Sequence, residues 1–105
     1  VNGESDSALV CGTISLSNAR HEVVCAGNAI DLSPTEFRLL EYLMENKNRV
    51  LTKQQLLDAV WGIDFDSSTT VVETFISYLR KKMSPEIDSM LVTVRGIGFK
   101  LVDKA

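Results

Sequence analysis

Residues 69–83 read TTVVETFISYLRKKM, and this stretch decides the fold class. Four apolar residues recur in it at the spacing of one helical face: Val72, Ile76, Leu79 and Met83. The stretch therefore predicts an amphipathic helix from about residue 69 to residue 82 or 83, where Ser84-Pro85 ends it. We expect its apolar face to be core, with Phe75 packing beside that face.

The opposite face of this helix carries short polar or basic side chains and no acid: Thr70, Thr74, Ser77 and Lys81. Such a face can approach the major groove of DNA, where a carboxylate would be repelled by phosphate. A plain solvated helix face has the same composition, so the neighbouring segments have to distinguish the two. Glu73 and Arg80 fall on the remaining edge of the helix.

The segments on either side complete a recognisable arrangement. Residues 51–62 read LTKQQLLDAVWG and predict a shorter helix, which a Thr52–Gln55 capping box opens and Gly62 ends. Residues 91–102 predict two strands around Gly96-Ile97-Gly98, with Arg95 at the tip and two glycines that let the backbone approach DNA closely. Two helices joined by a loop and followed by a β-hairpin are the winged helix-turn-helix arrangement.

The N-terminal part of the chain predicts a sheet and a first helix. A second capping box, Ser33-Pro34-Thr35-Glu36, opens a helix that should end near residues 46–48. Residues 9–32 form short strand-like segments, with Ala26-Gly27 as a hairpin turn. We therefore assign residues 1–7 to a linker and residues 8–105 to one α+β winged helix-turn-helix domain. This domain should have a four-stranded antiparallel N-terminal sheet, three helices and a C-terminal β-hairpin wing.

The distribution of charge qualifies this interpretation. The net charge of −3 by itself argues against a nucleic-acid partner. Residues 1–46 hold two bases and seven acids, net −5, whereas residues 47–105 hold nine bases and seven acids, net +2. Asymmetry of this kind is a weak indication of a nucleic-acid face in the second half.

Nothing in the sequence predicts catalysis. Cys11, Cys25 and the single histidine, His21, lack the spacing of a zinc site, and the chain has no set of nucleophile, base and orienting group. The Gly-x-Gly at 96–98 lacks the following helix that a nucleotide-binding loop needs. We therefore expect no enzyme, no metal and no cofactor. The chain has no apolar run of membrane-spanning length and no signal peptide, which favours the cytoplasm.

Three segments together resemble one known family. Residues 32–62, LSPTEFRLLEYLMENKNRVLTKQQLLDAVWG, are similar to the first two helices of the DNA-binding output domains of OmpR/PhoB-type bacterial response regulators. Residues 71–83, VVETFISYLRKKM, are similar to the family's recognition helix, and residues 92–102, VTVRGIGFKLV, are similar to its wing. The resemblance implies sequence-specific binding of double-stranded DNA, with the third helix in the major groove and the wing in the minor groove.

The resemblance also implies particular DNA contacts. They are Thr70, Thr74, Ser77, Tyr78, Arg80 and Lys81 on the third helix, and Thr93 and Arg95 on the wing. We add Lys53, at the start of the second helix, as a candidate for a phosphate contact. Two roles stay open for Arg80, a phosphate contact or an intramolecular ion pair. Lys81 and Lys82 are either DNA contacts or solvated charges.

The sequence departs from the family pattern on the third helix. Members often carry basic residues where Thr70, Ser77 and Tyr78 stand, and a histidine where Phe75 stands. Several phosphate or base contacts are thereby uncharged, so we expect a modest electrostatic contribution to DNA binding. The apolar seam of the helix is intact, so the fold is not in question.

Partners follow from the resemblance in the same way. The loop between the second and third helices, with Ile63, Asp64, Phe65 and Asp66, is implied to contact RNA polymerase. A receiver domain upstream would take its signal from a sensor histidine kinase and pair two output domains on direct-repeat promoter sites, whereas the isolated domain should be monomeric. The competing hypothesis is a module that binds chiefly protein, and the salt dependence of DNA binding separates the two.

Overall fold

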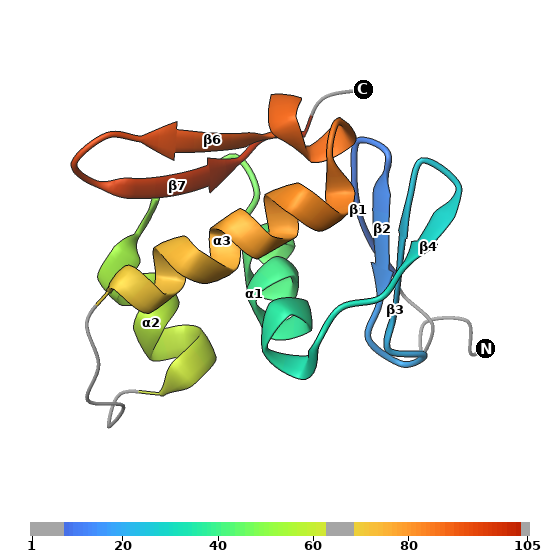
Figure 1. The fold of residues 1–105 in the computed structure, drawn as a ribbon, viewed down its shortest axis with the longest axis horizontal. Helices are drawn as coiled ribbons and strands as arrows, with labels where there is room; N and C mark the ends of the chain where they lie inside the picture. Colours follow the sequence, from blue (N-terminus) through green and yellow to red (C-terminus); the bar gives the residue numbers. More distant parts are fainter. Residues whose placement is uncertain (1–7, 63–68, 104–105) are drawn as a thin grey trace.

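The computed structural model describes residues 8–62 and 69–103. In chain order the elements are β1 Ala8–Cys11, β2 Ile14–Ser17, β3 Glu22–Cys25, β4 Asn28–Ile30, α1 Pro34–Glu45, β5 Leu51–Thr52, α2 Lys53–Trp61, α3 Thr70–Met83, a 3-10 helix Glu86–Ser89, β6 Leu91–Val94 and β7 Gly98–Leu101. The N-terminal sheet lies at one end of the molecule and the β6–β7 turn lies at the other, with the three helices between them (Figure 1). The winged helix-turn-helix prediction is confirmed.

The N-terminal sheet is a four-stranded antiparallel meander in the order β1-β2-β3-β4. Its strands present alternate residues to α1, so Ile14, Leu16, Val23 and Cys25 are buried. Ala26 and Gly27 both have positive φ, 52° and 85°, which is the geometry of a tight two-residue hairpin turn. The predicted turn between β3 and β4 is therefore confirmed.

Both predicted capping boxes are formed. The Ser33 side chain accepts a hydrogen bond from the Glu36 backbone N–H at 3.2 Å, and the Glu36 carboxylate accepts one from the Ser33 backbone N–H at 2.9 Å. Thr52 and Gln55 make the same reciprocal pair at the start of α2. Each box satisfies two backbone donors that a helix start otherwise leaves without a partner, which is why both helices begin at the predicted residues.

A three-stranded sheet in the order β5-β7-β6 joins the wing to the helices, and the sequence did not predict it. Directly before α2, Leu51 pairs with Phe99 and Thr52 pairs with Gly98. A Cβ on Gly98 would lie 1.9 Å from the Leu51 carbonyl oxygen. Gly98 is therefore required for the approach of β7 to β5, which corrects our expectation that this glycine serves a close approach to DNA.

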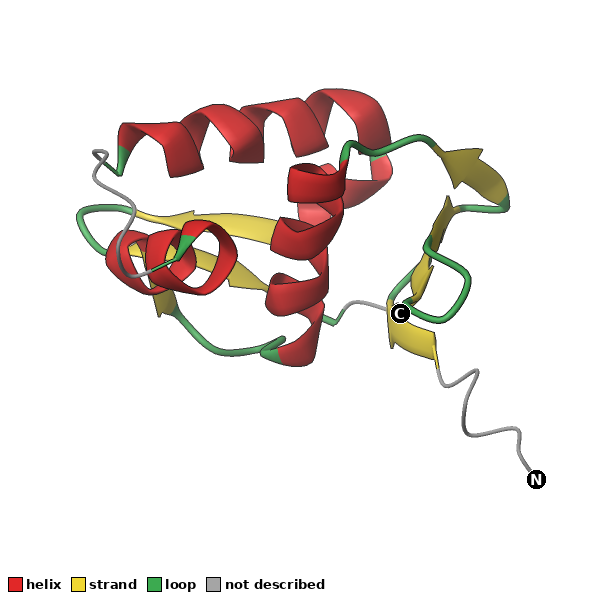
Figure 2. Cartoon of the chain, turned by 90° about the horizontal axis from the view of Figure 1, so that it is seen from below, coloured by secondary structure: helices red, strands yellow, loops and turns green. Residues whose placement is uncertain are grey.

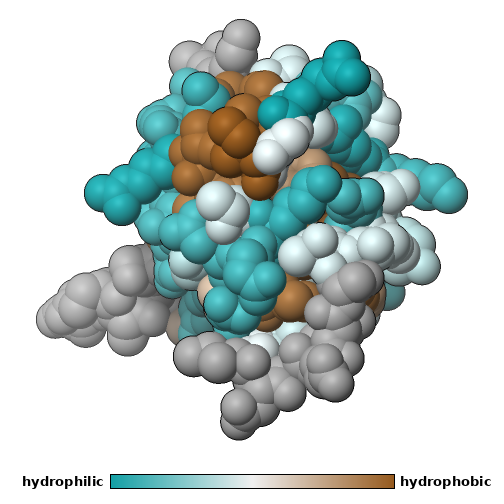
Figure 3. Space-filling view, turned by 90° about the vertical axis from the view of Figure 1, so that its left-hand side faces the viewer, coloured by the Kyte–Doolittle hydropathy of each residue, from teal (hydrophilic) through white to brown (hydrophobic). Residues whose placement is uncertain are grey.

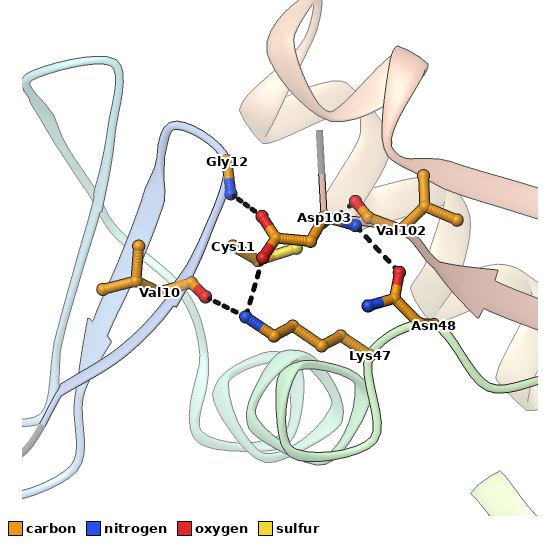
Figure 4. Close-up of polar contacts among 7 residues, drawn as sticks. All are labelled: Val10, Cys11, Gly12, Lys47, Asn48, Val102 and Asp103. Carbon is orange, nitrogen blue, oxygen red and sulfur yellow. Dashed lines mark hydrogen bonds and ion pairs between the residues drawn. The ribbon is translucent and has the colours of Figure 1, made fainter. Parts of the chain in front are cut away.

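The end of the chain is fastened to the N-terminal sheet by a polar cluster around Asp103 (Figure 4). The Asp103 carboxylate accepts hydrogen bonds from the Gly12 backbone N–H at 2.9 Å and from Lys47 Nζ at 2.9 Å. Lys47 also donates to the Val10 carbonyl, and the Asp103 backbone N–H donates to the Asn48 side chain. The hydrogen bonds from Lys47 and Gly12 lower the pKa of Asp103, and the same carboxylate raises the pKa of Lys47.

The core joins both sheets to the helices. Cys11 and Cys25 are free and buried, and burial raises the pKa of both thiols. His21 stacks on Phe37 with ring centroids 3.9 Å apart.

Within residues 8–62 and 69–103, no helix is long and apolar enough to span a membrane, and no group of three or more His, Cys, Asp or Glu side chains could hold a metal ion.

Candidate nucleic-acid interface

The predicted faces of α3 are confirmed. Its apolar stripe is buried: Val72, Ile76, Leu79 and Met83. The predicted contact residues Thr70, Thr74, Ser77, Tyr78 and Lys81 are exposed. The Thr74 hydroxyl donates to the Thr70 carbonyl at 3.2 Å. Figure 2 shows α3 along the outer edge of the molecule, with the wing strands beside it. One face of α3 is thus exposed to solvent.

An open groove of about 480 Å³ lies between α3, the wing and the start of α2. Its polar lining brings together six residues from these three elements: Lys53, Glu73, Ser77, Arg80, Thr93 and Arg95. Five of the six were predicted as DNA contacts, and the exception is Glu73. The groove therefore gathers three cations and two hydroxyls around one carboxylate.

Arg80 braces the wing against α3. Its Nη2 donates to Oγ1 of Thr93 at 2.8 Å and to the Leu91 carbonyl at 3.2 Å. Its Nε is buried and has no hydrogen-bond partner among the described residues. Of the two roles left open by the sequence, the ion pair is not formed with any described acid. Instead, the guanidinium bonds a neutral hydroxyl and a carbonyl.

Lys53 is held by Glu73 across the groove. Its Nζ lies 2.5 Å from Oε2 of Glu73, and its backbone N–H donates to the Ile97 carbonyl in the wing turn at 3.4 Å. The predicted phosphate contact is therefore already paired with a carboxylate of α3. The sequence placed Glu73 on an edge of the helix, but only the crossing of α2 and α3 shows that it faces Lys53.

Lys82 is committed to the fold, whereas Lys81 stays exposed. Lys82 Nζ contacts a carboxylate oxygen of Glu36 at 2.6 Å and the Asp31 carbonyl at 3.1 Å. Burial of Glu36 would raise its pKa, but the hydrogen bonds from Lys82 and Ser33 outweigh burial and lower the pKa. The end of α3 is thus tied to the start of α1. Of the two lysines, Lys81 is the one that remains available for a partner.

Three aromatic rings, one from α2 and two from α3, form a row on the side of α3 away from the wing. Trp61 meets Phe75 edge to face at 5.2 Å between centroids, and Phe75 meets Tyr78 in the same manner at 5.3 Å. Phe75 is half-buried, which confirms the predicted packing role, and Tyr78 is 42% exposed. The Tyr78 ring is therefore held in place while its surface remains open to a partner.

The tip of the wing combines a positive charge with apolar surface. Arg95 and Thr93 are exposed, and Ile97 in the turn is 51% exposed. Figure 3 views the molecule from the wing end and shows an apolar patch in its upper half, bordered by projecting hydrophilic side chains. The predicted polymerase-contact residues Ile63, Asp64, Phe65 and Asp66, and the predicted linker 1–7, lie outside the described residues.

The helix pair, the wing and the exposed polar face of α3 define a winged-helix DNA-binding domain. The family model described as "Transcriptional regulatory protein, C terminal" matches residues 27–101. The chain belongs to this family and is the DNA-binding domain of an OmpR/PhoB-type response regulator.

Individual relatives agree with this assignment. The chain is similar to transcriptional regulatory protein TrcR of Mycobacterium tuberculosis, 46% identical over 97 residues, which are 92% of this chain and 38% of TrcR. It is similar to the response regulator DrrB of Thermotoga maritima, an OmpR/PhoB homologue, with 27% identity and a TM-score of 0.80 over 90% of this chain and 44% of DrrB.

A third similar protein was solved in a complex. The DNA-binding domain of the response regulator AdeR, in complex with an intercistronic region, is 25% identical with a TM-score of 0.80, over 90% of this chain and 99% of that one. This chain itself spans less than half the length of TrcR and of DrrB.

Proposed function

We propose that this domain binds double-stranded promoter DNA sequence-specifically, with α3 in the major groove and the wing in the minor groove. The observation that carries the proposal is the position of Arg95 and the exposed face of α3 on either side of one groove. The AdeR domain, which shares the fold, is in complex with an intercistronic region. The role is that of a transcription regulator, and no step of it needs a catalytic group.

Two sets of residues divide the interaction. Thr70, Thr74, Ser77 and Tyr78 present short polar groups and one ring on the exposed face of α3, where they can meet base edges. The phosphate contacts fall to Lys81, Thr93 and Arg95, and Lys53 is a further candidate that is paired with Glu73 in the free domain. Arg80 supports this second set because it holds the strand that carries Thr93. Phosphate contacts set affinity and register, whereas base contacts select the sequence.

The partners of the whole regulator form the second part of the proposal. TrcR and DrrB are more than twice as long as the matched segment. Proteins of this length can also contain a receiver domain, which a sensor histidine kinase would phosphorylate. We propose that receivers pair two of these domains on direct-repeat promoter sites, and that Phe65 and its neighbours contact RNA polymerase. The isolated domain would then be monomeric and would bind a single half-site weakly. The cytoplasm is the compartment in which these partners meet.

The decisive experiment is a salt titration of DNA binding. Each phosphate contact contributes about −0.9 to the slope of log K against log salt, so we expect a total of about −3 to −5 for this weakly basic surface. Arg95→Ala should weaken binding, and more strongly at A·T-rich sites with a narrow minor groove. Arg38→Ala removes the same charge from an exposed site on α1 and should leave binding unchanged. If no duplex shows salt-sensitive binding, the domain is a protein-binding module.

The two remaining parts are tested separately. In the full-length regulator, Phe65→Ala should leave DNA affinity unchanged and reduce activated transcription. Loss of folding on that change would instead show a core residue. Sedimentation of the isolated domain at micromolar concentration should give a monomer, and a stable dimer would contradict the proposed dependence on receivers.

A further inference from the structure

The ion pair between Lys53 and Glu73 lines the proposed DNA groove. Lys53 opens α2 and Glu73 lies in the first turn of α3, so the pair spans the two helices. Their side chains are 34% and 48% exposed. A pair this accessible to solvent can open and exchange one partner for another without unfolding the domain.

Glu73 is the only carboxylate among the described residues that line the groove. The other polar residues there are cations or hydroxyls, all of which suit phosphate. Arg80 is engaged with Thr93 and Leu91, and Arg95 is exposed at the wing tip. Lys53 is thus the one groove cation that an acid already neutralises. A phosphate that approaches Lys53 meets a competitor with the same charge sign and the same kind of acceptor oxygen.

We propose that Glu73 competes with DNA phosphate for Lys53 and thereby limits the affinity of the single domain for DNA. This proposal rests on the proposed DNA-binding function. To bind a phosphate, Lys53 has to leave the Glu73 carboxylate, which then faces the polyanion without its partner. The domain consequently holds DNA less tightly than its count of basic residues suggests. Stable occupation of a promoter then depends on two domains acting together.

The alternative role for this pair is a strut that fixes α2 against α3. The buried apolar contacts argue against the role of a strut, because the two helices already share an apolar interface that includes Leu56, Leu57 and Ile76. An exposed ion pair adds little to the stability of such an interface. Glu73→Gln should therefore fold normally, and thermal unfolding of the variant checks this before any binding measurement.

The test compares Glu73→Gln with Glu45→Gln, an exposed position on α1 that gives the same change in net charge away from the groove. Binding is measured on a duplex that the wild type selects from a random pool and on a scrambled duplex, at several salt concentrations. Glu73→Gln should bind both duplexes more tightly, by up to about fivefold at low salt, the range that exposed ion pairs reach. Its salt slope should be steeper than that of the wild type by about 0.9, because Lys53 becomes one more phosphate contact. Glu45→Gln should show neither change.

The double variant Lys53→Gln/Glu73→Gln completes the cycle. It should return the slope to the wild-type value, and Lys53→Gln alone should bind more weakly than the double variant, because an unpaired carboxylate then remains in the groove. If Glu73→Gln binds no more tightly than Glu45→Gln and keeps the wild-type slope, Glu73 is not a competitor. If the wild type itself shows no salt-sensitive binding, the proposed function has failed instead.

Discussion

Arg80 of α3 donates a 2.8 Å hydrogen bond from Nη2 to Oγ1 of Thr93 in the wing, and this contact links the helix proposed for the major groove to the hairpin proposed for the minor groove. The same nitrogen also donates to the Leu91 carbonyl. One guanidinium therefore fixes the wing to α3, in addition to the pairing of β7 with β5.

Arg80→Lys should loosen the wing although the charge is kept, because the lysine ammonium does not extend as far as Nη2 and lacks the rigid planar group that directs this nitrogen at Thr93 and Leu91. We expect a loss of about 1–2 kcal/mol in the free energy of unfolding and weaker DNA binding. Backbone amides of residues 91–101 should exchange with deuterium faster than in the wild type. Lys81→Ala, at the exposed neighbouring position, should leave this exchange unchanged. Unchanged exchange in Arg80→Lys would show that the wing is held by its strand pairing alone.

Tyr78→Phe and Ser77→Ala should change which bases the domain prefers. Phe75 holds the Tyr78 ring, so removal of the hydroxyl leaves the ring in place and takes away one polar group from the exposed face. A good contact to a base edge discriminates by about 1–3 kcal/mol, whereas the salt slope should stay that of the wild type. Sequences selected from a random DNA pool by each variant provide the measurement. Identical selected sequences from variant and wild type would exclude these side chains from base recognition.

Leu79→Ala should destabilise the domain by about 2–5 kcal/mol, because it leaves a cavity in the fully buried seam of α3. Lys81→Ala, two residues away on the exposed face, should change the free energy of unfolding by no more than about 0.5 kcal/mol. Urea unfolding of the two variants provides the comparison. Equal small effects would mean that the assigned register of α3 is wrong.

Gly98→Ala should be more harmful than Gly96→Ala, although both glycines belong to the wing. A Cβ at position 98 would collide with the Leu51 backbone, so β7 would have to move away from β5 at a cost of about 3 kcal/mol or more. At position 96 a Cβ would meet nothing within 4 Å, and only the positive φ of 77° adds strain, about 1–2 kcal/mol. Thermal unfolding of both variants tests the order, and the reverse order would contradict the β5–β7 pairing.

Acid should weaken the junction between α1 and α3. The pKa of Glu36 is lowered in the folded domain, so its ionised form stabilises the fold above the ordinary pKa of about 4.5, and this stabilisation is lost as the pH falls through the lowered value. Glu36→Gln should be less stable than the wild type at neutral pH, and the difference should shrink in acid. Unfolding measured across this range should show the two stabilities converging. A difference that is constant with pH would mean that the Glu36–Lys82 pair contributes nothing through its charge.

Local signals account for the parts of the fold that the sequence predicted well. The capping boxes at Ser33 and Thr52 and the buried stripe of α3 involve residues no more than four positions apart or repeat along one helix. The pairing of β5 with β7 joins two residues of one strand to partners more than 45 positions later, and no pattern in so short a strand specifies it. The 3-10 helix Glu86–Ser89 was missed for a similar reason, because four residues are too few to show a period.

The candidate site shows the same difference between features set by local sequence and features set by long-range contacts. Helical periodicity was enough to identify the exposed face of α3, including Thr74 and Ser77. The partners of Arg80, Lys53 and Lys82 depend on how elements cross in space, and each lies at least eleven residues away along the chain. Charge and helix position alone could therefore name these side chains as candidates but could not separate those free to meet DNA from those engaged within the fold.

The short strand β5 has a consequence for the DNA rather than for the protein. Thr52 is both its last residue and the N-cap of α2, and β5 pairs with the wing strand β7. The distance between the wing tip and the start of the helix pair is thus fixed by hydrogen bonds and can vary little. A duplex whose adjacent major and minor grooves do not match this distance has to bend or twist to be bound, and the energy of that deformation depends on its base steps. Base pairs that no side chain touches would in this way influence which promoters are occupied.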